Sequence, residues 1–179
     1  MFRNEPWHDG LEENTNFDCY LKLASGGELF FELKFSEQDF GSAKADTKHR
    51  EKLARIYKPR LRMMVRPEFL TAEVFFRNYQ LLRNISYLCD DHDTRLFLVF
   101  PRSNLRLAQA QSILDSAMLP DTRDKISILY LENLIDRILQ SSICADPAFQ
   151  EHYRLFRAKY LPDWSSEPSF FSLGDGNEF

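Results

Sequence analysis

The stretch that decides the fold is residues 17–35, which read FDCYLKLASGGELFFELKF. Apolar and polar side chains alternate within residues 17–23 and again within residues 29–35, and a period of two is typical of half-buried strands. Between the two runs lies Ser25-Gly26-Gly27, a strong signal for a hairpin. We therefore predict two antiparallel strands joined by a tight turn.

The length of the turn decides which side chains face one another. A two-residue Gly26-Gly27 loop would set polar against apolar side chains on both faces of the hairpin. A three-residue loop, Ser25 to Gly27, pairs Tyr20 with Glu32 and Asp18 with Lys34 and keeps the apolar side chains together. Because a one-residue slip moves every side chain to the other face, the alternation favours the three-residue loop. Asp18, Glu32 and Lys34 are then expected to converge on the polar face.

Outward from the hairpin, the pattern predicts a single α/β domain over residues 1–161. Residues 95–100 and 126–131 are apolar runs expected to form buried strands, the first of them central. Helices are expected at 42–58, ended by Pro59, and at 68–89, 108–118, 132–141 and 147–160. The stretch up to Pro67 is expected to be a loop, and Asp90 to Asp93 a polar turn rather than a metal cluster. The tail, residues 162–179, is expected to be either flexible or docked by its aromatic side chains.

Composition limits the classes of protein that fit. The chain has 179 residues, of which 44% are hydrophobic, enough for one core. Its three cysteines show no CxxC spacing, which argues for a reducing, cytoplasmic setting. No basic leader and no run of about 18 apolar residues is visible, so secretion and membrane insertion are not expected.

Charge is segregated along the chain. The net charge is −4, yet residues 44–66 hold nine basic and two acidic side chains, a local balance of +7. Such a patch can bind the phosphates of double-stranded DNA on an otherwise acidic protein. The alternative, a solvated helix face, stays open. The side chains expected to contact DNA are Lys44, Lys48, Arg50, Lys52, Arg55 and Lys58.

The trio on the hairpin suits phosphodiester hydrolysis. Two carboxylates, Asp18 and Glu32, can hold a hard cation such as Mg²⁺, for which Mn²⁺ can substitute, and the Leu33 carbonyl could be a further ligand. A bound cation polarises the phosphoryl group and activates water. Lys34 could orient that water or stabilise the developing charge. The alternative is that Glu32 and Lys34 form an ordinary solvent-facing ion pair.

Three motifs strengthen the first interpretation: Asn14-Thr15-Asn16-Phe17-Asp18, Phe31-Glu32-Leu33-Lys34-Phe35-Ser36-Glu37 and Tyr79-Gln80-Leu81-Leu82-Arg83-Asn84. Over residues 5–140 the chain resembles a family of bacterial restriction-endonuclease-like proteins within the PD-(D/E)XK nuclease superfamily. The resemblance implies an α/β, three-layer fold with a central mixed sheet flanked by helices. It also implies a homodimer.

The resemblance also assigns roles to single residues. It implies that Asp18 and Glu32 are metal ligands and that Lys34 is the catalytic lysine. Gln80 would lie on a helix beside the site and orient a ligand or a phosphate; an ordinary polar helix position is the alternative. Arg83 would contact DNA. Glu37 could support the site, although an exposed residue at a strand end is the interpretation that its position favours.

One feature departs from the family pattern. In such nucleases a helix before the first strand commonly donates another acidic residue, and none of Glu5, Glu12 and Glu13 lies in a convincing helix. We expect a cytoplasmic, Mg²⁺-dependent endonuclease that hydrolyses DNA. The alternatives are a catalytically impaired DNA-binding module of the same fold and a protein-interaction domain that uses the basic segment 44–66.

Overall fold

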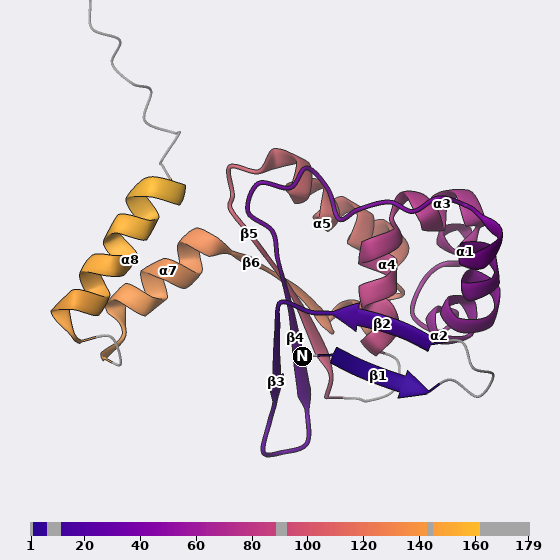
Figure 1. The fold of residues 1–179 in the computed structure, drawn as a ribbon, viewed down its shortest axis with the longest axis horizontal. Helices are drawn as coiled ribbons and strands as arrows, with labels where there is room; N and C mark the ends of the chain where they lie inside the picture. Colours follow the sequence, from indigo (N-terminus) through magenta and orange to yellow (C-terminus); the bar gives the residue numbers. More distant parts are fainter. Residues whose placement is uncertain (1, 7–11, 89–92, 143–144, 162–179) are drawn as a thin grey trace, which may run out of the picture.

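The fold is built around one mixed β-sheet (Figure 1). The computed structural model describes residues 2–6, 12–88, 93–142 and 145–161, with the backbone alone before residue 16. The sheet has the order β3-β4-β5-β6, in which β3 is antiparallel to β4 and the other pairs are parallel. The strands are β3 (Cys19–Lys22), β4 (Glu28–Leu33), β5 (Arg95–Phe100) and β6 (Ile126–Tyr130).

Helices cover both faces of this sheet (Figure 1). On one face, α4 (Tyr79–Ile85) and α5 (Leu105–Ala117) enclose the larger core with side chains such as Phe30 and Leu98. On the other face, α7 (Leu131–Gln140) and α8 (Pro147–Tyr160) form a smaller apolar cluster. The expected α/β class, with a central mixed sheet between helical layers, is confirmed.

The hairpin forms, but in a different register from the predicted one. Cys19 pairs with Phe31 and Lys22 with Glu28, and the backbone N–H of Leu23 donates to Gly27 at 2.8 Å. The loop is therefore Ala24 to Gly26, not Ser25 to Gly27. The predicted pairs Tyr20–Glu32 and Asp18–Lys34 are wrong by two residues. A shift of two leaves every side chain on its predicted face, because side chains alternate with a period of two.

The basic segment is helical beyond the predicted end. It contains α1 (Thr47–Lys52), a π-helical turn η1 (Leu53–Tyr57) and α2 (Lys58–Leu61). The prediction that Pro59 ends the helix is wrong. Proline cannot donate a backbone hydrogen bond, and the wider π turn just before it lets the chain continue. The helix starts at residue 47 rather than 42, because the Asp46 side chain caps it by accepting from the His49 N–H at 2.9 Å.

The single long helix predicted over 68–89 is also corrected. The chain forms η2 (Pro67–Leu70), α3 (Ala72–Arg77), α4 and η3 (Ser86–Leu88), with a break at Asn78. The Asn78 side chain donates to the Val74 carbonyl at 3.0 Å, which competes with regular helix. A neighbouring loop uses the break: Ala43 N–H donates to Phe76 and Gln80 N–H to Gly41.

Among the remaining predicted elements, one strand and three helices are confirmed and one strand is corrected. β5 is a central strand as expected, and α5, α7 and α8 lie close to their predicted positions. β6 lies at the edge of the described sheet and is mostly half-buried, so the prediction of a second buried strand is wrong. Two short strands that were not predicted, β1 (Phe2–Pro6) and β2 (Glu12–Asn16), pair with each other, and α6 (Pro120–Arg123) follows α5.

Two predictions concern residues outside the described ranges. Residues 90–92 of the polar turn and the tail 162–179 are among them, so these predictions stay as they are. In the described part of the chain, no helix is both long enough and apolar enough to cross a membrane.

Candidate active site

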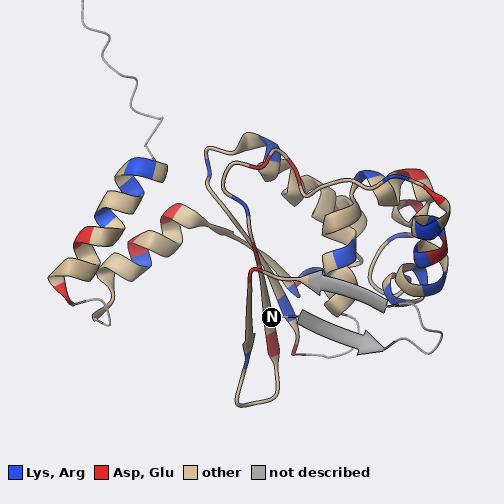
Figure 2. Ribbon diagram, viewed as in Figure 1, with Lys and Arg blue, Asp and Glu red and all other residues tan. Residues whose placement is uncertain are grey.

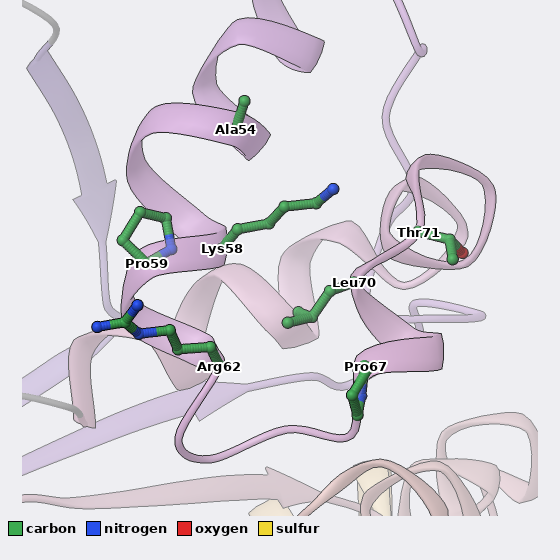
Figure 3. A pocket seen from close by; sticks show the side chains of 7 residues that line it. All are labelled: Ala54, Lys58, Pro59, Arg62, Pro67, Leu70 and Thr71. Carbon is green, nitrogen blue, oxygen red and sulfur yellow. The ribbon is translucent and has the colours of Figure 1, made fainter.

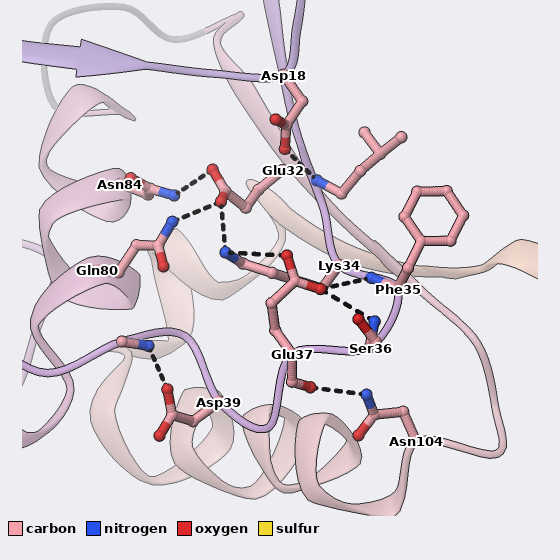
Figure 4. Close-up of polar contacts among 12 residues, drawn as sticks. Asp18, Glu32, Lys34, Phe35, Ser36, Glu37, Asp39, Gln80, Asn84 and Asn104 are labelled. Carbon is pink, nitrogen blue, oxygen red and sulfur yellow. Dashed lines mark hydrogen bonds and ion pairs between the residues drawn. The ribbon is translucent and has the colours of Figure 1, made fainter.

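The predicted site lies on the face of β4 that packs against α4. Phe30 and Glu32 are two residues apart and point to the same face, where their exposed fractions are only 1% and 4%. The alternative interpretation, a solvent-facing ion pair of Glu32 and Lys34, is therefore wrong, because α4 covers this face (Figure 4). Glu32 is a buried carboxylate, and such a group needs hydrogen bonds or a counter-charge.

Three side chains meet the Glu32 carboxylate (Figure 4). Gln80 Nε2 donates to Oε1 at 2.5 Å, and Asn84 Nδ2 donates to Oε2 at 3.0 Å. The Lys34 ammonium lies 3.2 Å from Oε1. One helix, α4, and one strand, β4, together fix the orientation of this carboxylate.

Burial sets the electrostatics of Glu32. Removal from water raises the pKa of its carboxyl above the ordinary value of 4.5, and the positive charge of Lys34 acts in the opposite direction. The hydrogen bonds from Lys34 and Asn84 also lower this pKa, while the negative charge of Asp18 raises it. A carboxyl with a perturbed pKa beside a specific charge partner is a candidate functional group.

Lys34 lies between two carboxylates. Its side chain is only 11% exposed, and its ammonium is 4.0 Å from Glu37 Oε1 as well as 3.2 Å from Glu32 Oε1. Glu37 Oε2 accepts the backbone N–H groups of Phe35 at 2.8 Å and Ser36 at 3.1 Å. Although partial burial acts to raise the pKa of Glu37, these backbone groups and the Lys34 charge hold it below 4.5.

Asp18 completes the group from β3's side of the sheet. It immediately precedes β3, is exposed, and its Oδ2 accepts the Leu33 N–H at 2.7 Å. The structure thus brings Asp18, Glu32, Lys34 and Gln80 together as the hairpin pattern and the resemblance predicted. Their catalytic and metal-binding roles stay predictions.

Asn84 is the contact residue that sequence reasoning missed. It belongs to the quoted motif 79–84 and follows Gln80 by four residues, so both lie on the same face of α4. A polar residue in the apolar stripe that continues with Ile85 and Leu88 was the available signal.

The donor set can be compared with what a metal requires. Within the described ranges, no three His, Cys, Asp or Glu side chains lie close enough together to hold a metal ion. Asp18 and Glu32 offer two carboxylates, and Mg²⁺ in proteins is often held by one or two carboxylates together with water. The residues present therefore fit a hard, mostly hydrated cation, not a fully protein-coordinated one.

The basic residues gather along α1 and α2 (Figure 2). Lys44, Lys48 and Lys58 are exposed. Arg50 donates to the Ala45 carbonyl at 2.9 Å, and Arg55 pairs with Glu51 at 2.9 Å. Lys52 is half-buried. The exposed lysines are thus better placed for an outside anion than the two arginines.

Two cations remain to be described: Arg62, which lines the same hollow as Lys58, and Arg83 on α4. Lys58 and Arg62 border an open hollow whose other lining residues are Ala54, Pro59, Pro67, Leu70 and Thr71 (Figure 3). Arg83, on α4, has its guanidinium 5.6 Å from the centre of the Tyr79 ring, and its Nε is buried without a hydrogen-bond partner among the described residues.

Comparison with known proteins identifies the family. No curated protein and no solved structure matches the chain. One family model, described as Restriction Endonuclease associating with ARP, matches residues 1–161. The mixed sheet, its two helical layers and this match agree, and the chain belongs to the restriction-endonuclease-like family Restriction Endonuclease associating with ARP.

Proposed function

We propose that the chain is a metal-dependent endonuclease of the PD-(D/E)XK superfamily that hydrolyses phosphodiester bonds in DNA. The observation that carries the proposal is the ion pair between the buried Glu32 on β4 and the largely buried Lys34 just after it, with Asp18 beside them. A carboxylate and an ammonium that are both removed from water carry a large desolvation cost, so such a pair is weak evidence for a purely stabilising role.

Asp18, Glu32 and the Leu33 carbonyl would hold the cation, Mg²⁺ or Mn²⁺. Leu33 donates its N–H to Asp18, whereas the next residue, Lys34, donates its N–H to Val99 on β5 at 2.9 Å. In an extended strand the N–H and C=O of one residue point to the same edge, so the Leu33 carbonyl faces Asp18. The bound cation would lower the pKa of a coordinated water and neutralise charge on the phosphoryl group.

The protein's own groups supply orientation and charge. Lys34 would hold its ammonium toward the phosphoryl oxygen and the attacking water, because the carboxylates of Glu32 and Glu37 both hold it. Gln80 would keep Glu32 in place through its amide. Lys34 directly follows β4 and Gln80 lies on α4, so both side chains are attached to regular elements, which favours precise placement.

Double-stranded DNA would be bound by the basic helices. Lys44, Lys48 and Lys58 are exposed and could contact phosphates, together with Arg50, Lys52, Arg55 and Arg83. Counterion release would make the affinity fall steeply with salt. We place this activity in the cytoplasm and expect a homodimer, since two sites are needed to cut two strands.

The first test is cleavage of linear DNA with Mg²⁺ or Mn²⁺. Asp18→Asn, Glu32→Gln and Lys34→Met should each lower the rate by at least about 10²-fold, because each removes a ligand or a preorganised charge. Glu73→Gln, which alters an exposed ion pair with Arg77, should match wild type. Equal cleavage by all of these proteins would disprove the catalytic assignment.

A second candidate function is a non-catalytic interaction module. The family description speaks of association with ARP, which is the observation that favours an interaction role. This candidate predicts no cleavage by wild type at any metal concentration. Salt-dependent DNA binding without cleavage would point to a DNA-binding module, and absence of both would point to a protein-interaction domain.

A further inference from the structure

Two side-chain amides of α4 donate hydrogen bonds to the Glu32 carboxylate, one to each of its oxygens. Gln80 and Asn84 are one helical turn apart, and each donates a side-chain N–H, Gln80 to Oε1 and Asn84 to Oε2. Figure 4 shows both amides reaching Glu32 from α4, while Asp18 lies on the strand side. The carboxylate plane is thereby held against rotation.

Asn84 fits poorly as a packing residue. Its exposed fraction is 0%, and its Oδ1 is buried without a hydrogen-bond partner among the described residues. A buried amide with an unused acceptor lowers stability, whereas an apolar side chain of similar shape would fill the same space without that cost. The contact that accounts for an amide at this position is the one with Glu32.

The hydrogen bonds also determine which oxygen of Glu32 can accept a further partner. An ionised carboxylate has about four acceptor positions, two on each oxygen. Gln80 and Lys34 both use Oε1, and Asn84 uses one position of Oε2. Among the contacts of the described residues, one position on Oε2 is left.

We infer that Asn84 is a positioning residue that fixes Glu32 so that Oε2 is presented to the divalent cation. The inference rests on the proposed function, since it assumes that Glu32 is a ligand. Neighbours that orient a metal ligand are a recurrent part of metal sites, and their loss typically weakens metal binding by about 10–100-fold.

The test measures Mn²⁺ binding to the full chain by calorimetry, with the electron paramagnetic resonance spectrum of the bound Mn²⁺ as a second readout. Asn84→Leu removes the amide and keeps the branched shape, and Asn84→Ala serves if the leucine variant does not fold. Ile85→Ala, at a neighbouring buried position that is not among the Glu32 contacts, is the matched control for lost packing. Circular dichroism confirms that each variant is folded at the temperature of the titration.

We expect about 10–100-fold weaker Mn²⁺ binding and an altered spectrum for the Asn84 variants, with Ile85→Ala unchanged. If wild type binds Mn²⁺ and a folded Asn84 variant binds it equally well with the same spectrum, the inference is wrong while the metal site stands. Equal weakening by Ile85→Ala would also overturn it, because general packing would then explain the loss. If wild type binds no Mn²⁺, the proposed function fails and the inference fails with it.

Discussion

On one face of β4, Phe30 and Glu32 meet the helical layer that includes α4; on the other, Phe31 and Leu33 meet α7 and α8. The first face is almost fully buried, with exposed fractions of 1% and 4%, whereas Phe31 and Leu33 are only half-buried. The face that carries the charged Glu32 is therefore less exposed to solvent than the apolar face. In β4 the more deeply buried face is thus the one against the larger core, although it carries a charged residue.

The largest expected effect comes from truncating one aromatic ring on each face. Phe30→Ala should lower the free energy of unfolding by about 3–5 kcal/mol, the usual cost for a fully buried phenylalanine. Phe31→Ala should lower it by roughly half as much, because the half-buried ring keeps partial contact with water and loses mainly its stacking on Phe97. Urea denaturation measures both losses. Equal losses would show that the two faces are equally important to the core.

A pH titration of stability should separate the two carboxylates beside Lys34. Burial raises the pKa of Glu32, so between pH 4.5 and that raised pKa the native chain keeps a proton that the unfolded chain has released. The free energy of unfolding then falls as pH rises through this window. In Glu32→Gln this fall should be absent, and the variant should gain stability relative to wild type as pH rises.

The contribution of Glu37 to the free energy of unfolding should change with pH in the opposite direction. Partial burial opposes its ionisation, but its own backbone N–H, those of Phe35 and Ser36, and Lys34 together hold the pKa of its carboxyl below 4.5. Its contribution to stability is present above pH 4.5 and is lost as pH falls through the lowered pKa. Glu37→Gln is therefore the matched control for Glu32→Gln in metal-free buffer. For each variant the quantity to compare is the difference in free energy of unfolding from wild type as a function of pH. If this difference changes with pH in the same direction for Glu32→Gln and Glu37→Gln, burial is not the dominant influence on the pKa of Glu32.

The hairpin shows how far sequence reasoning reaches. Alternation placed Asp18, Glu32 and Lys34 on one face, because a side-chain period of two is a property of the strand itself. It left the register wrong by two residues, since both registers keep the same faces together and the choice depends on which loop closes better. It also could not tell that α4 covers the polar face, because that depends on tertiary packing.

The break between α3 and α4 likewise depends on contacts that the sequence pattern does not reveal. Residues 68–88 have helical spacing throughout, but the Asn78 side chain and the loop at Gly41 and Ala43 break the helix by supplying alternative hydrogen bonds. That break ends α3 and starts α4, and Gln80 and Asn84 both lie on α4. Asn84 was overlooked because the function of a single polar residue in an apolar stripe becomes visible only when its partner, Glu32, is placed.

The smallest predicted effect concerns the contact between the loop after β4, at Glu37, and the start of α5, at Asn104. Asn104 caps α5 by accepting the Leu107 N–H at 3.2 Å, and its Nδ2 donates to the Glu37 carbonyl at 2.8 Å. Asn104→Ala should lower the free energy of unfolding by about 1 kcal/mol, the usual effect of losing a helix cap. Asn104→Asp keeps the cap but loses the donor to Glu37, so it separates the two roles. If Asn104→Asp is as stable as wild type but cleaves DNA with Mg²⁺ more slowly than wild type, the bond from Asn104 to Glu37 helps to position Lys34. If Asn104→Asp matches wild type in both, Asn104 acts only as a cap, and Lys34 is held by the carboxylates alone.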